Sequence, residues 1–141
     1  MNISEQGLTL IKESEALRLE SYADSIGIPT IGYGHTSLVR LGDVCTEVEA
    51  DAFLISDLET VEKCIKNSVS VELTQGQYDA LCSFVFNLGC TALRNSTLLR
   101  LLNSGDDVGA GEQFKRWDHA GGKILAGLTK RREKEAEMFL A

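Results

Sequence analysis

The stretch EALRLESYADSIGIPTIGYGHT, residues 15–36, differs in composition from the sequence on either side of it. Within it, glycine and proline recur between β-branched and aromatic residues, a pattern typical of short strands joined by turns. Glycine continues to recur in this way as far as Gly42. We therefore predict a small antiparallel β lobe over residues 18–46, whereas the sequence on both sides of it predicts helices.

Helical periodicity lies on each side of this lobe. Before it, the spacing of apolar residues predicts an N-terminal helix over residues 5–17. After it, Thr46 and Glu49 form a capping box, in which both side chains bond to backbone N–H groups at the start of a helix. Apolar residues then recur at steps of three or four, so we expect a connecting helix over residues 47–67.

A helical lobe is predicted over residues 68–141. Thr74 and Gln77 form a second capping box, and the helix that follows is apolar on all sides until Gly89 ends it. The later elements that we expect are short helices beginning at Ser96 and at Asp106 or Asp107, a glycine-rich loop over residues 120–127, and a final helix over residues 128–140.

Length and composition fit one globular domain, residues 1–141. The predicted fold class is α+β, with a mainly helical lobe, which includes the N-terminal helix, joined by a long helix to the small antiparallel β lobe. Nothing in the sequence suggests a repeat or a low-complexity segment.

The net charge of −7 is unevenly distributed, because residues 1–70 carry all of it. Nucleic-acid binders usually present a basic patch, so we expect no nucleic-acid partner. No apolar run approaches the roughly 20 residues of a membrane-spanning helix, and no signal peptide is visible before Leu8. We expect a monomer without stable membrane association.

The four cysteines, Cys45, Cys64, Cys82 and Cys90, are far apart and contain no C-x-x-C pair, which argues against a zinc cluster. We interpret them as reduced residues that behave as small apolar side chains. Cys82 and Cys90 are spaced four residues on either side of Phe86, which predicts that all three share one helix face.

Two carboxyl groups and a hydroxyl group are closely spaced in the opening stretch: eight residues separate Glu15 from Asp24, and five separate Asp24 from Thr30. A carboxyl group in the last turn of a helix faces the negative end of the helix dipole, which favours a protonated Glu15. Asp24 lies in turn-forming sequence and is expected to stay ionised. Thr30, on a returning strand, would help Asp24 to hold a water molecule, which suits hydrolysis of a glycosidic bond by inversion.

This stretch resembles the active-site segment of the phage-type lysozymes, the endolysins of glycoside hydrolase family 24. The family's E-x8-D-x5-T pattern falls on Glu15, Asp24 and Thr30, and TIGYGHT resembles its strand and turn. Similarity continues in the blocks QYDALCSFVFNLG, STLLRLLN and GLTKRREKEAEMFL, so that it covers nearly the whole chain. Ala16 departs from the pattern, because the family usually has glycine after the acid.

The resemblance implies a lysozyme-like fold with the saccharide bound between its two lobes, and no cofactor or metal. Glu15 would act as the acid, Asp24 would activate water and Thr30 would position it. Gly34 and His35 would lie beside the substrate, although histidine next to a turn is more often structural. An arginine at the start of the last helix, Arg131 or Arg132, would pair with Glu15, unless both belong to a solvated basic turn.

The implied partner is bacterial peptidoglycan, cleaved between N-acetylmuramic acid and N-acetylglucosamine for host cell lysis. The protein would be made in the bacterial cytoplasm and would act in the periplasm after release. A lytic transglycosylase that cuts the same bond without water is one alternative, and a catalytically silent wall-binding module is another. We expect Trp117 in the core and His119 in a solvated loop.

Overall fold

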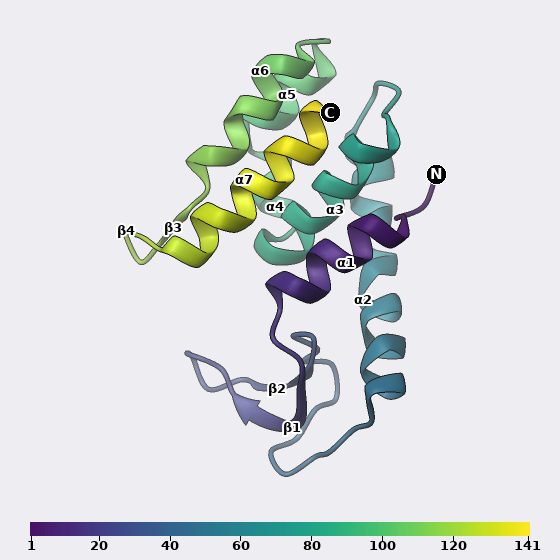
Figure 1. The fold of residues 1–141 in the computed structure, drawn as a ribbon, viewed down its shortest axis with the longest axis vertical. Coiled ribbons are helices and arrows are strands. Elements are labelled where there is room, and N and C mark those ends of the chain that lie inside the picture. Colours follow the sequence, from purple (N-terminus) through teal and green to yellow (C-terminus); the bar gives the residue numbers. More distant parts are fainter. The chain divides into compact units, whose positions relative to one another are not determined.

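The computed structural model of all 141 residues contains two compact units (Figure 1). The β unit is residues Lys12–Thr60, and the helical unit combines Met1–Ile11 with Val61–Ala141. Helices α1 (Glu5–Ser14) and α2 (Glu47–Ser68) each contribute residues to both units.

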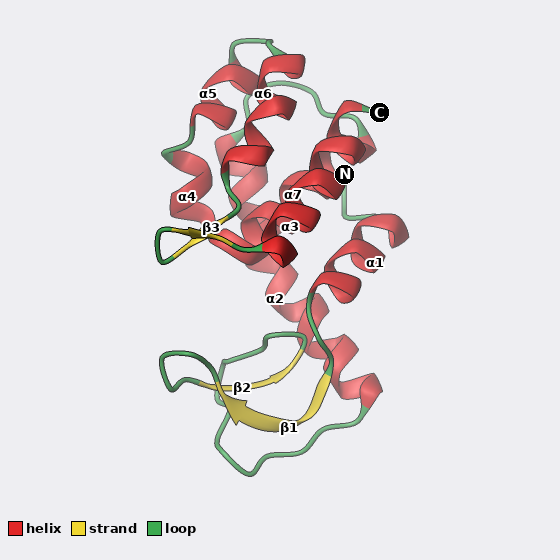
Figure 2. Cartoon of the chain, turned by 60° about the vertical axis from the view of Figure 1, so that its left-hand side comes forward, coloured by secondary structure: helices red, strands yellow, loops and turns green.

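The β unit is organised around one antiparallel hairpin (Figure 2). Strand β1 (Arg18–Ala23) pairs with β2 (Pro29–Gly32), with Tyr22 opposite Thr30 and an irregularity in register towards Arg18. The loop that follows β2 returns to β1, where Cys45 N donates to Leu19 O at 2.8 Å. The predicted small antiparallel sheet is therefore confirmed.

Helix α2 begins directly after Thr46, the first residue of the predicted capping box. Thr46 N donates to Glu49 Oε1 at 3.0 Å, and Glu49 N donates to Thr46 Oγ1 at 3.1 Å, which confirms it. Strand β2 packs closely against this helix, since a Cβ atom on Gly32 would lie 3.3 Å from Ala50 Cβ. Gly32 also has a φ of +65°, a conformation that favours glycine.

The expected N-terminal helix is shorter than predicted, since α1 ends at Ser14 instead of residue 17. Arg18 already pairs with Gly32, so the chain leaves the helical conformation before the hairpin begins. Glu15 therefore follows the helix instead of lying in its last turn.

Helix α3 (Gln75–Leu88) is the centre of the helical unit, with an unbroken run of buried residues from Gln77 to Val85, and it ends before Gly89, as predicted. Helix α7 (Ala126–Leu140) packs along it (Figure 1). The remaining elements are α4 (Cys90–Arg94), α5 (Thr97–Asn103), α6 (Asp107–Gln113), the 3-10 helix η1 (Phe114–Arg116), and the strands β3 (His119–Ala120) and β4 (Lys123–Ile124). None of the helices combines the length and the apolarity needed to cross a bilayer.

The predictions for the segment before the last helix and for the residues after Gly89 were wrong in detail. The glycine-rich segment is not a loop but a hairpin of β3 and β4, because Gly121 and Gly122 both have positive φ and form its two-residue turn. Helix α7 consequently starts at Ala126, two residues early, and the five-residue helix α4 was not predicted.

The cysteine prediction was wrong for one pair. Cys64 on α2 and Cys90 on α4 form a disulfide across a sequence separation of 26, whereas Cys45 and Cys82 are free. Cys90 also lies beyond the end of α3, so it does not continue the helix face of Cys82 and Phe86. Local spacing cannot reveal such a pairing, because it depends on how α4 packs in the fold.

We predict that the Cys64–Cys90 bond stabilises the protein. Replacing both cysteines with serine should lower the free energy of unfolding by about 3 kcal/mol, measured by urea denaturation, because the bond restricts the unfolded chain. Cys45→Ser is the control and should leave stability nearly unchanged, since this thiol is only partly buried.

Thiol titration offers an independent readout of the same bond. Denatured protein without reductant should expose the thiols of the free cysteines, Cys45 and Cys82, and reduction should add the other two. In native protein Cys82 should be unreactive, since burial raises its pKa and hides its sulfur. Four thiols without reductant would contradict the disulfide.

Candidate active site

Asp24 closes the β1–β2 hairpin with its own carboxylate. Its Oδ1 accepts hydrogen bonds from Ile26 N at 3.0 Å and from Ile28 N at 2.8 Å, while Asp24 N donates to Ile28 O at 3.0 Å. Aspartate is common in such turns because its short side chain can bond to the backbone a few residues on. These contacts fix the orientation of the carboxylate, and its second oxygen, Oδ2, takes part in neither of the two side-chain hydrogen bonds.

Thr30 lies on the same face of the hairpin as Asp24. Since Tyr22 is opposite Thr30 and residues two apart share a face, Asp24 is a diagonal neighbour of Thr30. The Thr30 side chain is buried, and its hydroxyl donates to Ile28 O at 2.9 Å. The structure thus brings together Asp24 and Thr30, two of the three residues that the spacing singled out.

Glu15, the third of these residues, lies beside the turn that follows β2. A Cβ atom on Gly34 would lie 3.7 Å from Glu15 Oε2, so residue 34 itself places no side chain against this carboxyl oxygen. Gly34 has a φ of +80° and is exposed, whereas Glu15 is half-buried. Ile31 and His35 exchange backbone hydrogen bonds of 2.9 and 2.8 Å across this turn.

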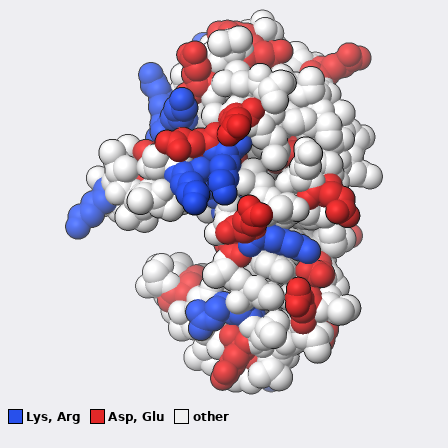
Figure 3. Space-filling model, in the orientation of Figure 1, with Lys and Arg blue, Asp and Glu red and all other residues white.

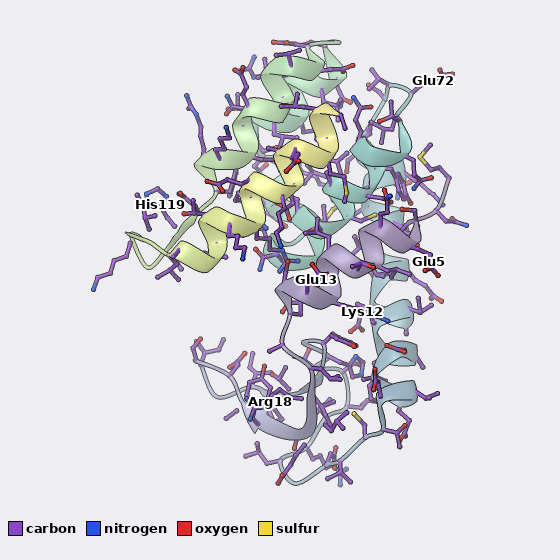
Figure 4. The ribbon with its side chains drawn as sticks, viewed as in Figure 1. Glu5, Lys12, Glu13, Arg18, Glu72 and His119 are labelled. Atoms are coloured by element: carbon purple, nitrogen blue, oxygen red, sulfur yellow. A yellow bond between two sulfur atoms is a disulfide. The ribbon has the colours of Figure 1, made fainter.

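Lys12 anchors the end of α1, three residues before Glu15. Its Nζ lies 3.0 Å from Asp51 Oδ1 on α2 and 5.7 Å from the centre of the Tyr33 ring. The hydrogen bond to Asp51 raises the pKa of Lys12, and burial opposes this shift. Figure 4 shows Lys12 and Glu13 at the end of α1 and Arg18 in β1. Lys12 and Asp51 therefore join the segment before Glu15 to α2.

His35, next to Gly34, contacts two side chains of α2. Its Nδ1 donates towards Asp57, with distances of 3.0 and 2.9 Å to the two carboxylate oxygens. Its ring stacks on Phe53, with centroids 4.3 Å apart and an interplanar angle of 4°. The His35 side chain is 10% exposed and that of Asp57 29%. These contacts agree with the structural interpretation of His35.

Arg131 and Arg132 belong to the helical unit and are buried. Arg132 lies against Glu135, with Nε 2.6 Å from Oε1 and Nη2 2.9 Å from Oε2, and Arg131 donates to Ser83 Oγ at 3.2 Å. Burial raises the pKa of Glu135, and the charge of Arg132 and the hydroxyl of Ser83 oppose this shift. The pair is therefore not a solvated turn, and pairing of either arginine with Glu15 stays a prediction.

Trp117 and His119 differ in their surroundings. Trp117 is half-buried and meets Phe84 edge-on, with centroids 5.4 Å apart, so one side of it contributes to the core. His119 is exposed in β3, and its Nδ1 lies 2.9 Å from Asp118 Oδ1.

A pocket of about 410 Å³ lies within the β unit, beside Ile31 and His35. Its walls are mainly apolar and come from β2, the following loop and α2; they include Ile31, His35, Val39, Val44 and Phe53. Neither Glu15 nor Asp24 lines this pocket, so it is distinct from the two carboxyl groups that are predicted to be catalytic.

Three residues that hold the site were not found in the sequence: Lys12, Asp51 and Asp57. Each acts through a contact with a distant part of the chain, and each resembles an ordinary solvated residue in its own helix. Helical spacing shows which residues share a helix face, but it does not show which loop packs against that face.

Comparison with known proteins gives matches over the whole chain. The family model described as phage lysozyme matches residues 12–135. An endolysin of Acyrthosiphon pisum secondary endosymbiont phage 1 is 49% identical, and the match covers 99% of this chain and 98% of the relative. The endolysin of Salmonella phage P22 is 43% identical over 100% of this chain and 99% of its own.

A solved structure agrees with these matches. The muramidase domain of SpmX from Asticaccaulis excentricus is 39% identical and superposes with a TM-score of 0.94, over 99% of this chain and 98% of that domain. The helices and small antiparallel sheets of this chain thus form a lysozyme-type fold.

We predict that the contact between His35 and Asp57 stabilises the β unit. Asp57→Ala should lower the free energy of unfolding by about 2 kcal/mol at neutral pH, because it removes a hydrogen bond to a charged group that is largely shielded from water. Ser56→Ala, on the adjacent exposed position of α2, is the control. Equal free energies of unfolding for the two variants, measured by urea denaturation, would show that the contact does not stabilise the protein.

Proposed function

The chain belongs to the phage lysozyme family and is a glycoside hydrolase that acts on peptidoglycan, and on this premise we propose that it is an inverting muramidase. Its target would be the β-1,4 bond between N-acetylmuramic acid and N-acetylglucosamine. The observation that carries the proposal is the hairpin register, which places Asp24 and Thr30 on one face, while Glu15 lies beside the turn that follows β2.

Glu15 is the proposed general acid. An inverting glycosidase needs one carboxyl group to protonate the leaving oxygen and a second to activate water on the opposite side of the sugar ring. Gly34 supports this role, because the absence of a side chain there leaves room for a sugar beside Glu15 Oε2. Lys12 and Asp51 would hold the helix end from which Glu15 projects.

Asp24 and Thr30 would hold the attacking water through acceptor groups. The Thr30 hydroxyl has one proton, and it is already donated to Ile28 O, so towards a water molecule Thr30 can only accept. Asp24 Oδ1 is occupied by two backbone N–H groups, which leaves Oδ2 for the same water. A water that donates both protons to these acceptors would direct a lone pair towards the anomeric carbon, and Asp24 would remove its proton as the bond forms.

The proposed place of action is the periplasmic side of the bacterial wall, with the enzyme acting as a monomer after release from the cytoplasm. The names of its relatives, endolysins of phages, support a role in host lysis. The Cys64–Cys90 disulfide supports the location, because such bonds persist in oxidising compartments.

Removing either carboxyl group should abolish turnover. We expect Glu15→Gln and Asp24→Asn each to reduce the release of reducing ends from purified peptidoglycan by about a thousandfold or more, because each removes one of the two proton transfers. Glu13→Gln, the same chemical change two residues away, should keep wild-type activity. Circular dichroism must show that all variants are folded, and a variant that retained activity would exclude its residue from the mechanism.

The products test the stereochemistry and the use of water. Fresh products should carry the α configuration at the new reducing end by NMR, and oxygen from ¹⁸O-labelled water should appear there by mass spectrometry. Products with a 1,6-anhydro end would show a transglycosylase and overturn the hydrolytic proposal.

Thr30 should act through the acceptor capacity of its hydroxyl group. Thr30→Ser keeps the hydroxyl and should retain activity within about tenfold, whereas Thr30→Val should lose about a hundredfold in kcat with little change in KM. If Thr30→Val and Thr30→Ser had equal kcat values, the threonine would not position water.

A further inference from the structure

The β unit combines acidic charge with exposed apolar side chains. It contains three basic and ten acidic residues and therefore carries the whole net charge of −7, whereas the helical unit contains eleven of each. Most of the large apolar side chains that are exposed also belong to it: Leu19, Ile26, Ile28, Leu38, Leu41, Val44, Val48 and Ile55. In Figure 3, acidic side chains lie between broad uncharged areas in the region where Figure 1 draws β1 and β2. Such a surface suits a partner that offers positive charge together with apolar groups.

The pocket of about 410 Å³ in the β unit lies among these apolar residues. Ile31 and His35 are buried and form its floor together with the half-buried Phe53. Leu38 and Val44 also line the pocket but are 97% and 74% exposed, so they stand at its mouth. Sites for small ligands have volumes of roughly 300–1,000 Å³, so this pocket has room for one large apolar side chain.

The backbone conformation of Leu38 holds an apolar side chain at this mouth. Its φ of +59° makes it the one residue other than glycine with a positive φ. A residue with a Cβ atom pays roughly 1–3 kcal/mol for such a conformation, and strained residues of this kind cluster at sites that hold ligands. Because Leu38 gains no burial in return, its position favours a contact with a partner over a role in packing.

The charged groups around the mouth are mainly carboxylates. Asp43 lines the pocket and is exposed. Glu20 pairs with Val44 in an antiparallel bridge, and residues directly opposite each other share one face of a sheet. The loop between β2 and α2 contains one basic residue, Arg40. Acidic groups therefore outnumber basic ones beside the pocket, and they would attract a cation.

Cys45 is a natural reporter of this pocket, since it is a free cysteine in the wall. Burial raises the pKa of its thiol, and the charge of the nearby Glu49 adds to this shift. Cys82 is buried, and Cys64 and Cys90 are bonded to each other. In native protein, a thiol reagent therefore reacts mainly at Cys45, and its rate measures access to the pocket.

We propose that this pocket docks a basic peptide segment of a partner protein. One large apolar side chain of the segment enters the pocket, and lysine or arginine residues beside it face Glu20, Asp43 and Glu49. An apolar anchor in a pocket with a charged rim is the usual arrangement of a small protein interface. A second copy of this chain fits less well, because two β units of the same negative charge repel each other.

The proposed partner would contact the neighbours of the candidate catalytic groups. Ile31 in the floor follows Thr30, and His35 follows Gly34, which lies beside Glu15. The two floor residues also exchange backbone hydrogen bonds. A side chain in the pocket therefore touches the turn between them, although the docking site itself does not depend on the proposed muramidase activity.

The test measures the affinity of a defined peptide by fluorescence anisotropy. The probe is a labelled synthetic peptide with one tryptophan between pairs of lysines. Two control peptides have alanine in place of the tryptophan or glutamate in place of the lysines. The probe should bind at least about tenfold more tightly than either control, because burial of the tryptophan and attraction to the rim each contribute about 1.4 kcal/mol or more.

Two protein variants test the pocket and its rim against matched controls. Val44→Trp fills the mouth, whereas Val48→Trp places the same side chain at a position that is 78% exposed and does not line the pocket. The rim variant carries Glu20→Gln, Asp43→Asn and Glu49→Gln. Its control carries Glu72→Gln, Glu112→Gln and Glu137→Gln at exposed positions of the helical unit and has the same net charge.

The variants should differ from their controls in affinity for the probe. Val44→Trp should bind it about tenfold more weakly than Val48→Trp. The rim variant should bind it about tenfold more weakly than its control at low salt, and this difference should vanish near 1 M salt. Asparagine and glutamine keep the oxygens that accept backbone hydrogen bonds from Arg40 N and Thr46 N, so the loop should stay folded.

The parent protein offers a readout that does not depend on any substitution. Saturating probe should slow the alkylation of Cys45 by iodoacetamide at least about fivefold, measured by mass spectrometry without reductant. In NMR spectra, the amide signals of Ile31 and His35 should shift, whereas those of Val71 and Leu73 in the helical unit should not.

Several results would overturn the proposal. These are equal affinities of Val44→Trp and Val48→Trp, a probe that binds no more tightly than its alanine control, or binding that leaves the alkylation rate of Cys45 unchanged. Two further results would assign the pocket to another occupant. Binding to phosphatidylcholine vesicles that Val44→Trp abolishes would indicate a lipid, and a dimer in sedimentation that Val44→Trp separates would indicate a second copy of the chain.

Discussion

The candidate site depends on the backbone N–H and carbonyl groups of Ile28. Its N–H donates to Asp24 Oδ1, and its carbonyl oxygen accepts from both Asp24 N and Thr30 Oγ1. Gly27, with a φ of +89°, allows the chain to turn so that these contacts form. The hydrogen bonds that close the hairpin therefore also determine which lone pairs of Asp24 and Thr30 remain for a water molecule. In the proposed mechanism, the contacts that fold the hairpin are therefore the same contacts that orient Asp24 and Thr30 for catalysis.

Sequence reasoning succeeded where the deciding interaction is local. The capping boxes at Thr46 and Thr74 and the stop at Gly89 each involve residues within one turn of each other, so their residue types alone predict them. The β1–β2 hairpin is similar, since its turn residues and strand residues are adjacent in sequence. Asp24 and Thr30 are close in sequence and come together through this hairpin, whereas the catalytic roles of Glu15, Asp24 and Thr30 stay a prediction.

Apart from the local β3–β4 hairpin, the main predictions that failed are those that a distant segment decides. The Cys64–Cys90 bond depends on how α4 returns to α2, and the end of α1 depends on the pairing of Arg18 with Gly32. A solvated basic turn was one interpretation of Arg132, yet this side chain is fully buried together with Glu135 of the same helix. Burying such charges is costly unless they are paired and hydrogen-bonded, and the contact between Arg132 and Glu135 meets part of that cost.

Helix α2 contacts both the segment that carries Glu15 and the turn that contains Gly34. Lys12, three residues before Glu15, contacts Asp51, and His35, next to Gly34, contacts Asp57. Both carboxylates project from one continuous helix, so the segment that carries Glu15 and the turn beside it are positioned against the same rigid element. Catalytic groups must be held to within a fraction of an ångström, and two independent loops would add their motions together. Some of the acidic residues that make the β unit so negative thus serve as anchors, which is why its charge cannot be interpreted as surface character alone.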